Sequence, residues 1–195
     1  METLARRIPV VKTTIAGTND IGRLCVGNSR ALIVPMETTD EEYAHLQKRH
    51  PFNIPLLRLY KHVPDLGTRV ACNDCVALID PDLDEEIESI ISIVLHVRVY
   101  RRTIAGLNNV GSLCVINDSG AVVHHEASNT EIDELSKLLR KPVEVGTVNK
   151  GNTEFIADGV ATNCWAVFCG SETANYERAL LESVFRPIKL ELPPY

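Results

Sequence analysis

Two cysteines with the spacing of a metal or redox pair, Cys72 and Cys75, are the first residues in this sequence that could carry chemistry. A Cys-x-x-Cys pair can supply two thiolates to zinc or form a catalytic disulfide. A zinc site needs about four ligands, and no second pair with this spacing occurs in the chain. We therefore interpret both residues as core or near-surface thiols.

Two adjacent histidines, His124 and His125, are the next candidate ligands. They follow a short apolar run, and a metal role would need further ligands that the sequence does not place. We interpret them as a partly exposed loop pair. Residues 146–151 are rich in glycine but lack the Gly-Lys-Ser/Thr ending of a phosphate-binding loop. The sequence thus predicts no metal, no cofactor and no small-molecule substrate.

Composition narrows the class of partner. The chain has 195 residues, a net charge of -6 and 45% hydrophobic residues, which is typical of a globular protein. It has no apolar run of the roughly 20 residues that a membrane span needs, and residues 1–7 lack an apolar signal-peptide core. We expect a location in the cytoplasm and the nucleus. The acidic balance argues against nucleic acid as the main partner.

A repeat organises the positions of all these residues. Residues 14–26 recur as residues 103–115 with nine of thirteen positions identical, and Val70-Ala71-Cys72-Asn73 recurs as Val160-Ala161-Thr162-Asn163. A shorter spacing of 46 residues links residues 31–35 with residues 77–81. These spacings predict a unit of about 45 residues, present four times, in a single repeat domain over residues 1–195. The approximate units are residues 8–52, 53–96, 97–142 and 143–187.

Each unit shows the same order of local signals. An alternating apolar stretch predicts a half-buried strand at residues 10–15, 56–59, 97–100 and 143–145. A turn with glycine follows, at Gly22, Gly67, Gly111 and Gly159. A more continuous apolar run then predicts a buried strand at residues 31–34, 76–79, 121–123 and 166–168. Capping-box spacing predicts helix starts at Thr39 with Glu42, Asp82 with Glu85 and Ser128 with Glu131. Because one unit cannot bury its own strands and helix, we expect stacked units in a ring or partial ring.

The sequence resembles the eukaryotic translation initiation factor 6 family. The matching segments are residues 21–28 (IGRLCVGN), 72–74, 76–78, 81–84, 133–136, 146–149 and 182–185. The similarity extends from about residue 8 to residue 186. It implies a pentein fold, an α+β propeller of small sheets and helices. The family has five units and this chain shows four, so we expect a truncated first unit, through an internal start or an incomplete gene model, or a partner that supplies the missing unit.

The resemblance also implies a function and a mechanism. Members of the family bind the joining face of the large ribosomal subunit, sterically keep the small subunit away, and take part in large-subunit biogenesis in the nucleolus and cytoplasm. A truncated paralogue that no longer binds ribosomes is the first alternative. The pentein fold also hosts guanidine-modifying enzymes with a late cysteine nucleophile. Cys164 and Cys169 flank a core-like apolar run, so we expect no enzyme here.

Motif positions in the resemblance point to partner-binding residues. Loops at one end of a repeat scaffold commonly form its binding face, and the glycine turns place Arg23, Thr68, Leu113 and Phe155 there. We expect these residues to face a ribosomal protein beside the sarcin–ricin loop. Arg98, Arg101 and Arg102 form the densest basic cluster, which fits either a ribosomal RNA contact or a solvated strand end. The resemblance further implies Ser136 as a position of phosphorylation.

Overall fold

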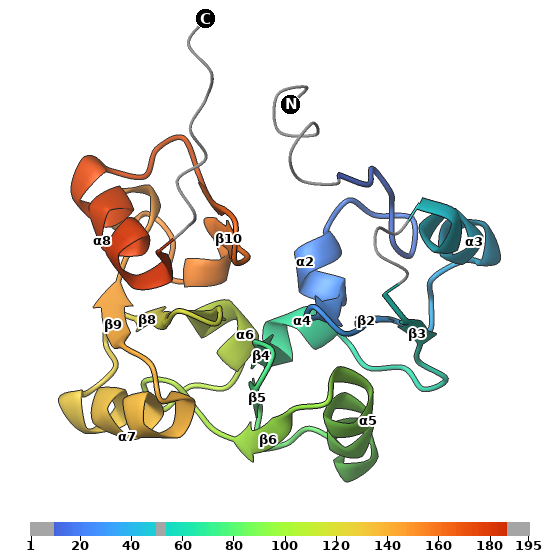
Figure 1. Cartoon of the computed structure of the whole chain (residues 1–195), viewed down its shortest axis with the longest axis horizontal. Coiled ribbons are helices and arrows are strands. Elements are labelled where there is room, and N and C mark those ends of the chain that lie inside the picture. Colours follow the sequence, from blue (N-terminus) through green and yellow to red (C-terminus); the bar gives the residue numbers. More distant parts are fainter. Residues whose placement is uncertain (1–9, 50–53, 187–195) are drawn as a thin grey trace, which may run out of the picture. The chain divides into compact units, whose positions relative to one another are not determined.

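The computed structural model describes residues 10–49 and 54–186. The chain divides into two compact units, Met1–Arg102 and Thr103–Tyr195, and each is described by itself. Among the described residues there are four small sheets, two in each unit. Figure 1 labels most of their strands and helices.

The first unit contains two sheets of the same design. In each sheet an antiparallel hairpin is followed by a helix and then by a third strand parallel to the second. The first set of elements is α2 (Ile21–Leu24), β1 (Val26–Gly27), β2 (Leu32–Val34), α3 (Asp40–Arg49) and β3 (Leu56–Arg58). The second set is α4 (Leu66–Arg69), β4 (Val70–Cys72), β5 (Val76–Ile79), α5 (Glu85–Leu95) and β6 (Arg98–Arg101).

The second unit repeats the design and then departs from it. Its first set of elements is α6 (Val110–Leu113), β7 (Cys114–Ile116), β8 (Ala121–His124), α7 (Asn129–Leu139) and β9 (Val143–Gly146). Its second set is η2 (Asn149–Gly151), η3 (Ile156–Asp158), β10 (Val160–Thr162), β11 (Val167–Cys169) and α8 (Asn175–Phe185). Among the residues that the structure describes, the sheet of β10 and β11 has two strands, whereas the other three sheets have three.

The predicted repeat and the α+β class are confirmed, with two corrections. Residues 10–14 are not a strand, and Ile15 forms only an isolated bridge with Thr18. Three of the predicted glycine turns are one-turn helices, and the short strand after each of them was not predicted. The alternating stretches at residues 56–59, 97–100 and 143–145 do contain strands, but each joins the sheet of the preceding hairpin.

A recurring asparagine ties neighbouring hairpins together. The side-chain oxygen of Asn28 accepts the N–H groups of Arg30 and Ala31, which closes its own turn. Its side-chain amide donates to the carbonyls of Asn73, at 3.2 Å, and Leu95, at 2.9 Å. Each asparagine therefore holds its own hairpin and the next one.

The same bonds recur in the second unit. Asn117 accepts from Ser119 and Gly120 and donates to the carbonyls of Asn163 and Phe185. The carbonyls of Leu95 and Phe185 lie at the ends of α5 and α8, where the last turn of a helix leaves carbonyls without an intrahelical partner. The asparagine thus also satisfies a helix end.

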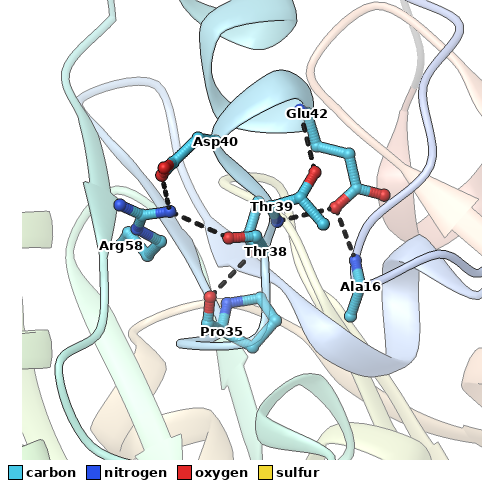
Figure 2. A network of polar contacts seen from close by, with 7 residues as sticks. All are labelled: Ala16, Pro35, Thr38, Thr39, Asp40, Glu42 and Arg58. Atoms are coloured by element: carbon cyan, nitrogen blue, oxygen red, sulfur yellow. Dashed lines mark hydrogen bonds and ion pairs between the residues drawn. The ribbon is translucent and has the colours of Figure 1, made fainter.

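A network of half-buried and exposed polar groups fixes the start of α3 (Figure 2). Two consecutive residues, Ala16 (φ 50°) and Gly17 (φ 74°), have left-handed backbone conformations. Their N–H groups donate to the Glu42 carboxylate at 2.9 and 3.0 Å, and Thr39 completes the capping box with Glu42. Paired N–H groups of left-handed residues form an anion-binding concavity, which the carboxylate fills.

Capping at the other helices is partly as predicted. Ser128 and Glu131 form a full capping box, and Glu131 also accepts from the N–H of Ala105. The predicted pairing of Asp82 with Glu85 is wrong, because the N-cap of α5 is Asp84, which accepts from the N–H of Glu86 at 2.9 Å. Asp82 instead contacts Arg69.

Three thiols that are half-buried or buried, and one buried histidine, lie in or beside these sheets. Burial raises the pKa of Cys25, Cys72 and Cys114 to about 12, so these thiols are not activated nucleophiles. The prediction of a partly exposed His124-His125 pair is wrong for His124, which ends β8 and is 4% exposed. Its Nδ1 accepts the N–H of Glu126, and burial together with His125 lowers its pKa.

Candidate partner-binding surface

An ion pair at the surface joins the two one-turn helices of the first unit. The guanidinium of Arg23, in α2, contacts the carboxylate of Asp65 through two bonds of 2.8 and 2.9 Å. The Arg23 side chain is 57% exposed and the Asp65 side chain 38% exposed. Two-point contact fixes the plane of the guanidinium, and it leaves the remaining N–H groups of Arg23 directed away from Asp65. The predicted residue Arg23 is therefore exposed and held in one orientation.

The backbones of α2 and α4 approach so closely that only glycine fits between them. A Cβ atom at Gly67 would overlap the Gly22 carbonyl oxygen and lie 2.8 Å from the Cys25 carbonyl oxygen. Gly22 itself has open space around its Cα. The contact brings Arg23 within reach of Asp65, so the fixed position of Arg23 depends on Gly67.

Thr68 lies beside this ion pair. It is half-buried, and its hydroxyl donates to the Asp65 carbonyl at 2.8 Å. The structure thus brings the predicted residues Arg23 and Thr68 together around Asp65, which sequence reasoning did not single out. Asp65 has a left-handed conformation (φ 50°), which Asp tolerates better than most residues. The signal was available, since Asp65 directly precedes the first residue of a repeated Ile/Leu-Gly motif.

The two predicted residues of the second unit lie on α6 and at the start of η3. Phe155 precedes η3 and is 37% exposed, so its ring is available at the surface. Leu113, the last residue of α6, is 1% exposed and packs in the core. Aligned by the repeat, Arg23 and Thr68 correspond to Ser112, which is 8% exposed. The repeat therefore points to Ser112, the residue before the predicted Leu113. Both side chains are buried, so neither offers a large exposed area.

The basic cluster near β6 is divided by the structure. Arg101 turns inward, where it pairs with Glu88 and donates to the carbonyls of Pro81 and Leu83. The other arginines of the cluster, Arg98 and Arg102, keep an exposed side chain. Arg101 therefore serves to hold α5 and its preceding loop, and Arg98 and Arg102 are the exposed members of the cluster.

Ser136 closes the end of α7. Its hydroxyl donates to the Lys141 carbonyl at 2.8 Å, and its own carbonyl accepts from the Lys141 N–H. Ser92 makes the same bond to Val97 at the end of α5. Phosphorylation of Ser136 stays a prediction. A phosphate there would lose the bond and place negative charge at the negative end of a helix.

Replacing Ser136 by alanine is expected to lower the free energy of unfolding by about 1 kcal/mol, because one side-chain hydrogen bond to a helix end is lost. Urea unfolding followed by circular dichroism measures the change. Thr130→Ala, at an exposed position of the same helix, serves as the control and should change stability by less. Equal effects of the two substitutions would show that the Ser136 bond contributes nothing specific.

The described residues contain no group of three or more His, Cys, Asp and Glu side chains that could hold a metal ion. Cys164 is exposed and Cys169 is half-buried, at the two ends of the β11 region. Within the described part of the chain, no helix is long and apolar enough to cross a membrane.

The fold defines a class: an α+β repeat protein of the pentein-like type, in which one-turn helices precede three of the hairpins. Its sequence matches the family model of the eIF-6 family over residues 1–184. Eukaryotic translation initiation factor 6-2 of Arabidopsis thaliana is 47% identical over 183 residues, which are 94% of this chain and 74% of that protein. The chain belongs to the eIF-6 family, and the resemblance found from the sequence is confirmed.

Two further relatives support the assignment to this family. Eukaryotic translation initiation factor 6 of Schizosaccharomyces pombe is 45% identical over 179 residues, which cover 92% of this chain and 73% of the relative. The protein of the same name from Drosophila melanogaster is 45% identical over 183 residues, covering 94% of this chain and 74% of the relative. These relatives are named as translation initiation factors and not as enzymes.

Proposed function

We propose that this chain binds the large ribosomal subunit at its joining face and thereby prevents association with the small subunit. It also takes part in large-subunit biogenesis, in the nucleolus and cytoplasm. The observation that carries the proposal is the family match across residues 1–184, together with relatives named as translation initiation factors. The partner at the contact is a ribosomal protein, with ribosomal RNA beside it.

The mechanism is steric, and it needs a fixed surface instead of a reacting group. The surface around Arg23 meets that need because its backbone is closely packed at Gly67 and its guanidinium is held by Asp65. A pre-ordered arginine loses less side-chain entropy when it binds a partner, and arginine is enriched among residues that dominate binding energy. We therefore place Arg23 at the contact.

Two substitutions separate contact with the partner from support within the chain. Arg23→Ala is expected to weaken co-sedimentation with salt-washed large subunits about tenfold, as expected for a contributing interface arginine. Asp65→Asn should weaken binding by less than Arg23→Ala, because it keeps the guanidinium and a residue tolerant of the left-handed conformation but loses the ionic contact that orders Arg23. Lys48→Ala, at an exposed position of α3, is the matched control.

Each outcome bears on a different part of the proposal. Failure of the unmodified protein to co-sediment, or to reduce joining of purified subunits, would overturn the proposed function and favour a paralogue without ribosome binding. Equal weakening by Arg23→Ala and Asp65→Asn would mean that Arg23 acts only by holding the two one-turn helices together. Equal binding by unmodified protein and Arg23→Ala would remove Arg23 from the contact.

A further inference from the structure

The hairpin of β10 and β11 carries side chains at the positions that other hairpins use to pack on the next set of elements. We number the sets in chain order, from set 1 (α2 to β3) through set 2 (α4 to β6) and set 3 (α6 to β9) to set 4 (η2 to α8). The hairpin of set 1 packs on set 2 within the first unit, and the hairpin of set 3 packs on set 4 within the second. Both contacts use the same positions of the earlier hairpin.

The fifth residue after the turn asparagine forms the apolar part of this contact. Ile33 of β2 is 0% exposed and shares a core cluster with Leu66, the first residue of α4. Val122 of β8 is 0% exposed and shares a cluster with Ile156, the first residue of η3. The counterpart in β11 is Phe168, which is 40% exposed. A side chain at this position therefore packs on the next set, and no described set covers Phe168 in this way.

The alternation of side chains along β11 explains the direction of Phe168. Its neighbours Val167 and Cys169 pack against a cluster that contains Leu181 of α8. Successive residues of a strand point to opposite faces, so Phe168 points away from this cluster. Its ring therefore lies on the face of the hairpin opposite to α8.

The turn asparagine adds a polar bond to the same contact. The side-chain amide of Asn28 donates to the carbonyl of Asn73 at 3.2 Å. The side-chain amide of Asn117 donates to the carbonyl of Asn163 at 3.5 Å. Asn163 closes its own turn through its side-chain oxygen, but its side-chain nitrogen has no partner among the residues that the structure describes. This nitrogen is a donor that the turn of a further set would satisfy.

The two residues after the asparagine also reach the next set. Ser29 donates through its N–H and its hydroxyl to the Asp74 carboxylate, at 2.9 and 2.6 Å. Arg30 donates to the Asp74 carbonyl at 2.6 Å. In the fourth hairpin these positions hold Cys164, which is exposed, and Trp165, which is 39% exposed. We call four residues the outer face of the fourth hairpin: Asn163, Cys164, Trp165 and Phe168.

Set 1 carries the groups that would receive this outer face. In sets 2 and 4 the residue that begins the short helix, Leu66 or Ile156, is 1% exposed beneath the earlier hairpin. Its counterpart in set 1 is Ile21, which begins α2 and is half-buried. The carbonyl of Asn28 and the side chain of Ser29 lie at the positions that accept bonds in set 2. Set 1 therefore offers both the apolar and the polar half of the contact.

We propose that the outer face of the fourth hairpin docks on set 1 of a second copy of this chain. In this contact the side-chain amide of Asn163 donates to the Asn28 carbonyl of the second copy. The ring of Phe168 packs on Ile21 of the second copy and removes apolar surface of both residues from water. The two surfaces differ, so the contact is heterologous and can continue from copy to copy.

A second copy is the occupant that the contacts favour. Where a hairpin is covered within a described unit, the covering set is the next one in the chain, and no described set follows α8. Two copies supply both halves of a contact that the chain already makes twice, between sets 1 and 2 and between sets 3 and 4. An unrelated protein would have to present a turn carbonyl and an apolar side chain at the same spacing.

Disulfide cross-linking of the full-length protein tests the proposal. Ser29 contacts Asp74 between sets 1 and 2, so Cys164 should lie against Ser29 of the second copy. Ser29→Cys then places two thiols within range of a disulfide. With copper–phenanthroline as the oxidant, it should give at least about tenfold more disulfide-linked dimer and larger species on a non-reducing gel than Ser89→Cys. Ser89 is an exposed residue of α5 in the same unit, which makes it the matched control.

Two further substitutions make the cross-link specific. Every protein in the comparison carries Cys75→Ser, because the exposed Cys75 thiol follows Asp74 and could capture the thiol introduced at position 29 within one chain. Adding Cys164→Ser to Ser29→Cys should return the cross-linked fraction to that of Ser89→Cys.

Sedimentation without a cross-link gives an independent measurement. The apparent mass of the unmodified protein should rise with protein concentration, as mass action requires. Phe168→Glu places a charge in the proposed contact and should keep the chain monomeric at the same concentrations. Tyr176→Glu is the matched control and should still self-associate, because Tyr176 is an aromatic residue of set 4 that lies on α8 and is 69% exposed.

Each result decides for or against the second copy. An unmodified protein that stays monomeric at every concentration, or equal cross-linking of Ser29→Cys and Ser89→Cys, would overturn the inference. A cross-link within single chains, seen as a faster-migrating monomer, would make set 1 of the same chain the occupant. Self-association that persists in Phe168→Glu would place the contact elsewhere. Dimers that require Cys164 and are lost with Phe168→Glu would support the proposal.

Discussion

Replacing Glu42 by glutamine is expected to lower the free energy of unfolding at neutral pH by about 2 kcal/mol, the range for hydrogen bonds to a charged group. The Glu42 carboxylate accepts from Thr14 at 2.7 Å and from the N–H groups of Ala16, Gly17 and Thr39. A glutamine amide keeps one acceptor oxygen but turns an NH₂ group toward donors. The bond from the Ala16 N–H to the carboxylate, which helps to stabilise the left-handed conformation of Ala16, is then weakened. Thermal or urea unfolding measures the change.

The same group predicts how stability depends on pH. Desolvation opposes the ionisation of Glu42, but hydrogen bonds from Thr14, Thr39, Gly17 and Ala16 outweigh it and lower the pKa to about 2. Folding lowers this pKa, so the stabilisation is fully present above the ordinary value of 4.5 and is lost as pH falls toward 2. The difference in stability between the unmodified protein and Glu42→Gln should therefore shrink across this interval.

Glu41→Gln provides the control, because Glu41 is the neighbouring residue, is exposed, and has the same charge in the same helical turn. Its substitution should change stability by less than about 0.5 kcal/mol, the usual range for surface positions. If Glu41→Gln and Glu42→Gln cost the same, the stabilisation comes from the helix dipole and not from the bonds to Ala16 and Gly17.

Replacing Gly67 by alanine should be the most damaging single-methyl change in the first unit, at about 3 kcal/mol. The added Cβ meets backbone atoms of α2 and its C-cap, namely the carbonyl oxygens of Gly22 and Cys25, and backbone cannot move aside as a flexible side chain can. Relief requires α2 and α4 to separate, which breaks the bonds between Arg23 and Asp65. We expect lower stability and weaker large-subunit binding together, measured by unfolding and by co-sedimentation below the melting temperature.

Gly22→Ala is a close control for this substitution. Gly22 is the second residue of α2 as Gly67 is of α4, but it has no neighbour within 4 Å of the added atom and its φ is not positive. Alanine should be tolerated there, or should stabilise the chain slightly by restricting the unfolded state. A Gly67→Ala protein as stable as Gly22→Ala would contradict the close approach of the two helices.

The repeat, the helices and three of the four buried strands could be predicted from the sequence because each leaves a local pattern. The prediction of a buried strand at residues 166–168 is wrong in its burial, since Phe168 of β11 is 40% exposed. Helix α5 shows this well: Ile87, Ile91 and Leu95 follow one another at helical spacing, and all three are fully buried. The first strand of each hairpin was missed because it has only two or three residues, too few for alternation to be visible.

The candidate surface was harder to predict because it depends on which way side chains point. Leu113 and Ser112 are both buried in α6, which the turn signal around Gly111 does not indicate. The sequence places Arg101 in a basic cluster at the end of β6. In the structure its side chain instead forms an ion pair with Glu88, in the preceding helix α5. Asp65 was missed because its importance comes from Arg23, 42 residues earlier in the chain. Such pairings are set by packing between repeats, which a linear pattern does not record.

In each three-stranded sheet the last strand, β3, β6 or β9, comes from the start of the next sequence repeat. The sequence repeat and the structural sheet therefore have different boundaries. A deletion series cut where the sequence motif restarts, near residues 53, 97 or 143, would remove β3, β6 or β9 and leave the preceding hairpin open. Cuts placed after these strands, such as after Arg102, where the first compact unit ends, keep each sheet whole. A fragment cut where the sequence motif restarts could lose binding because its last sheet is incomplete. That loss would be mistaken for removal of a binding residue.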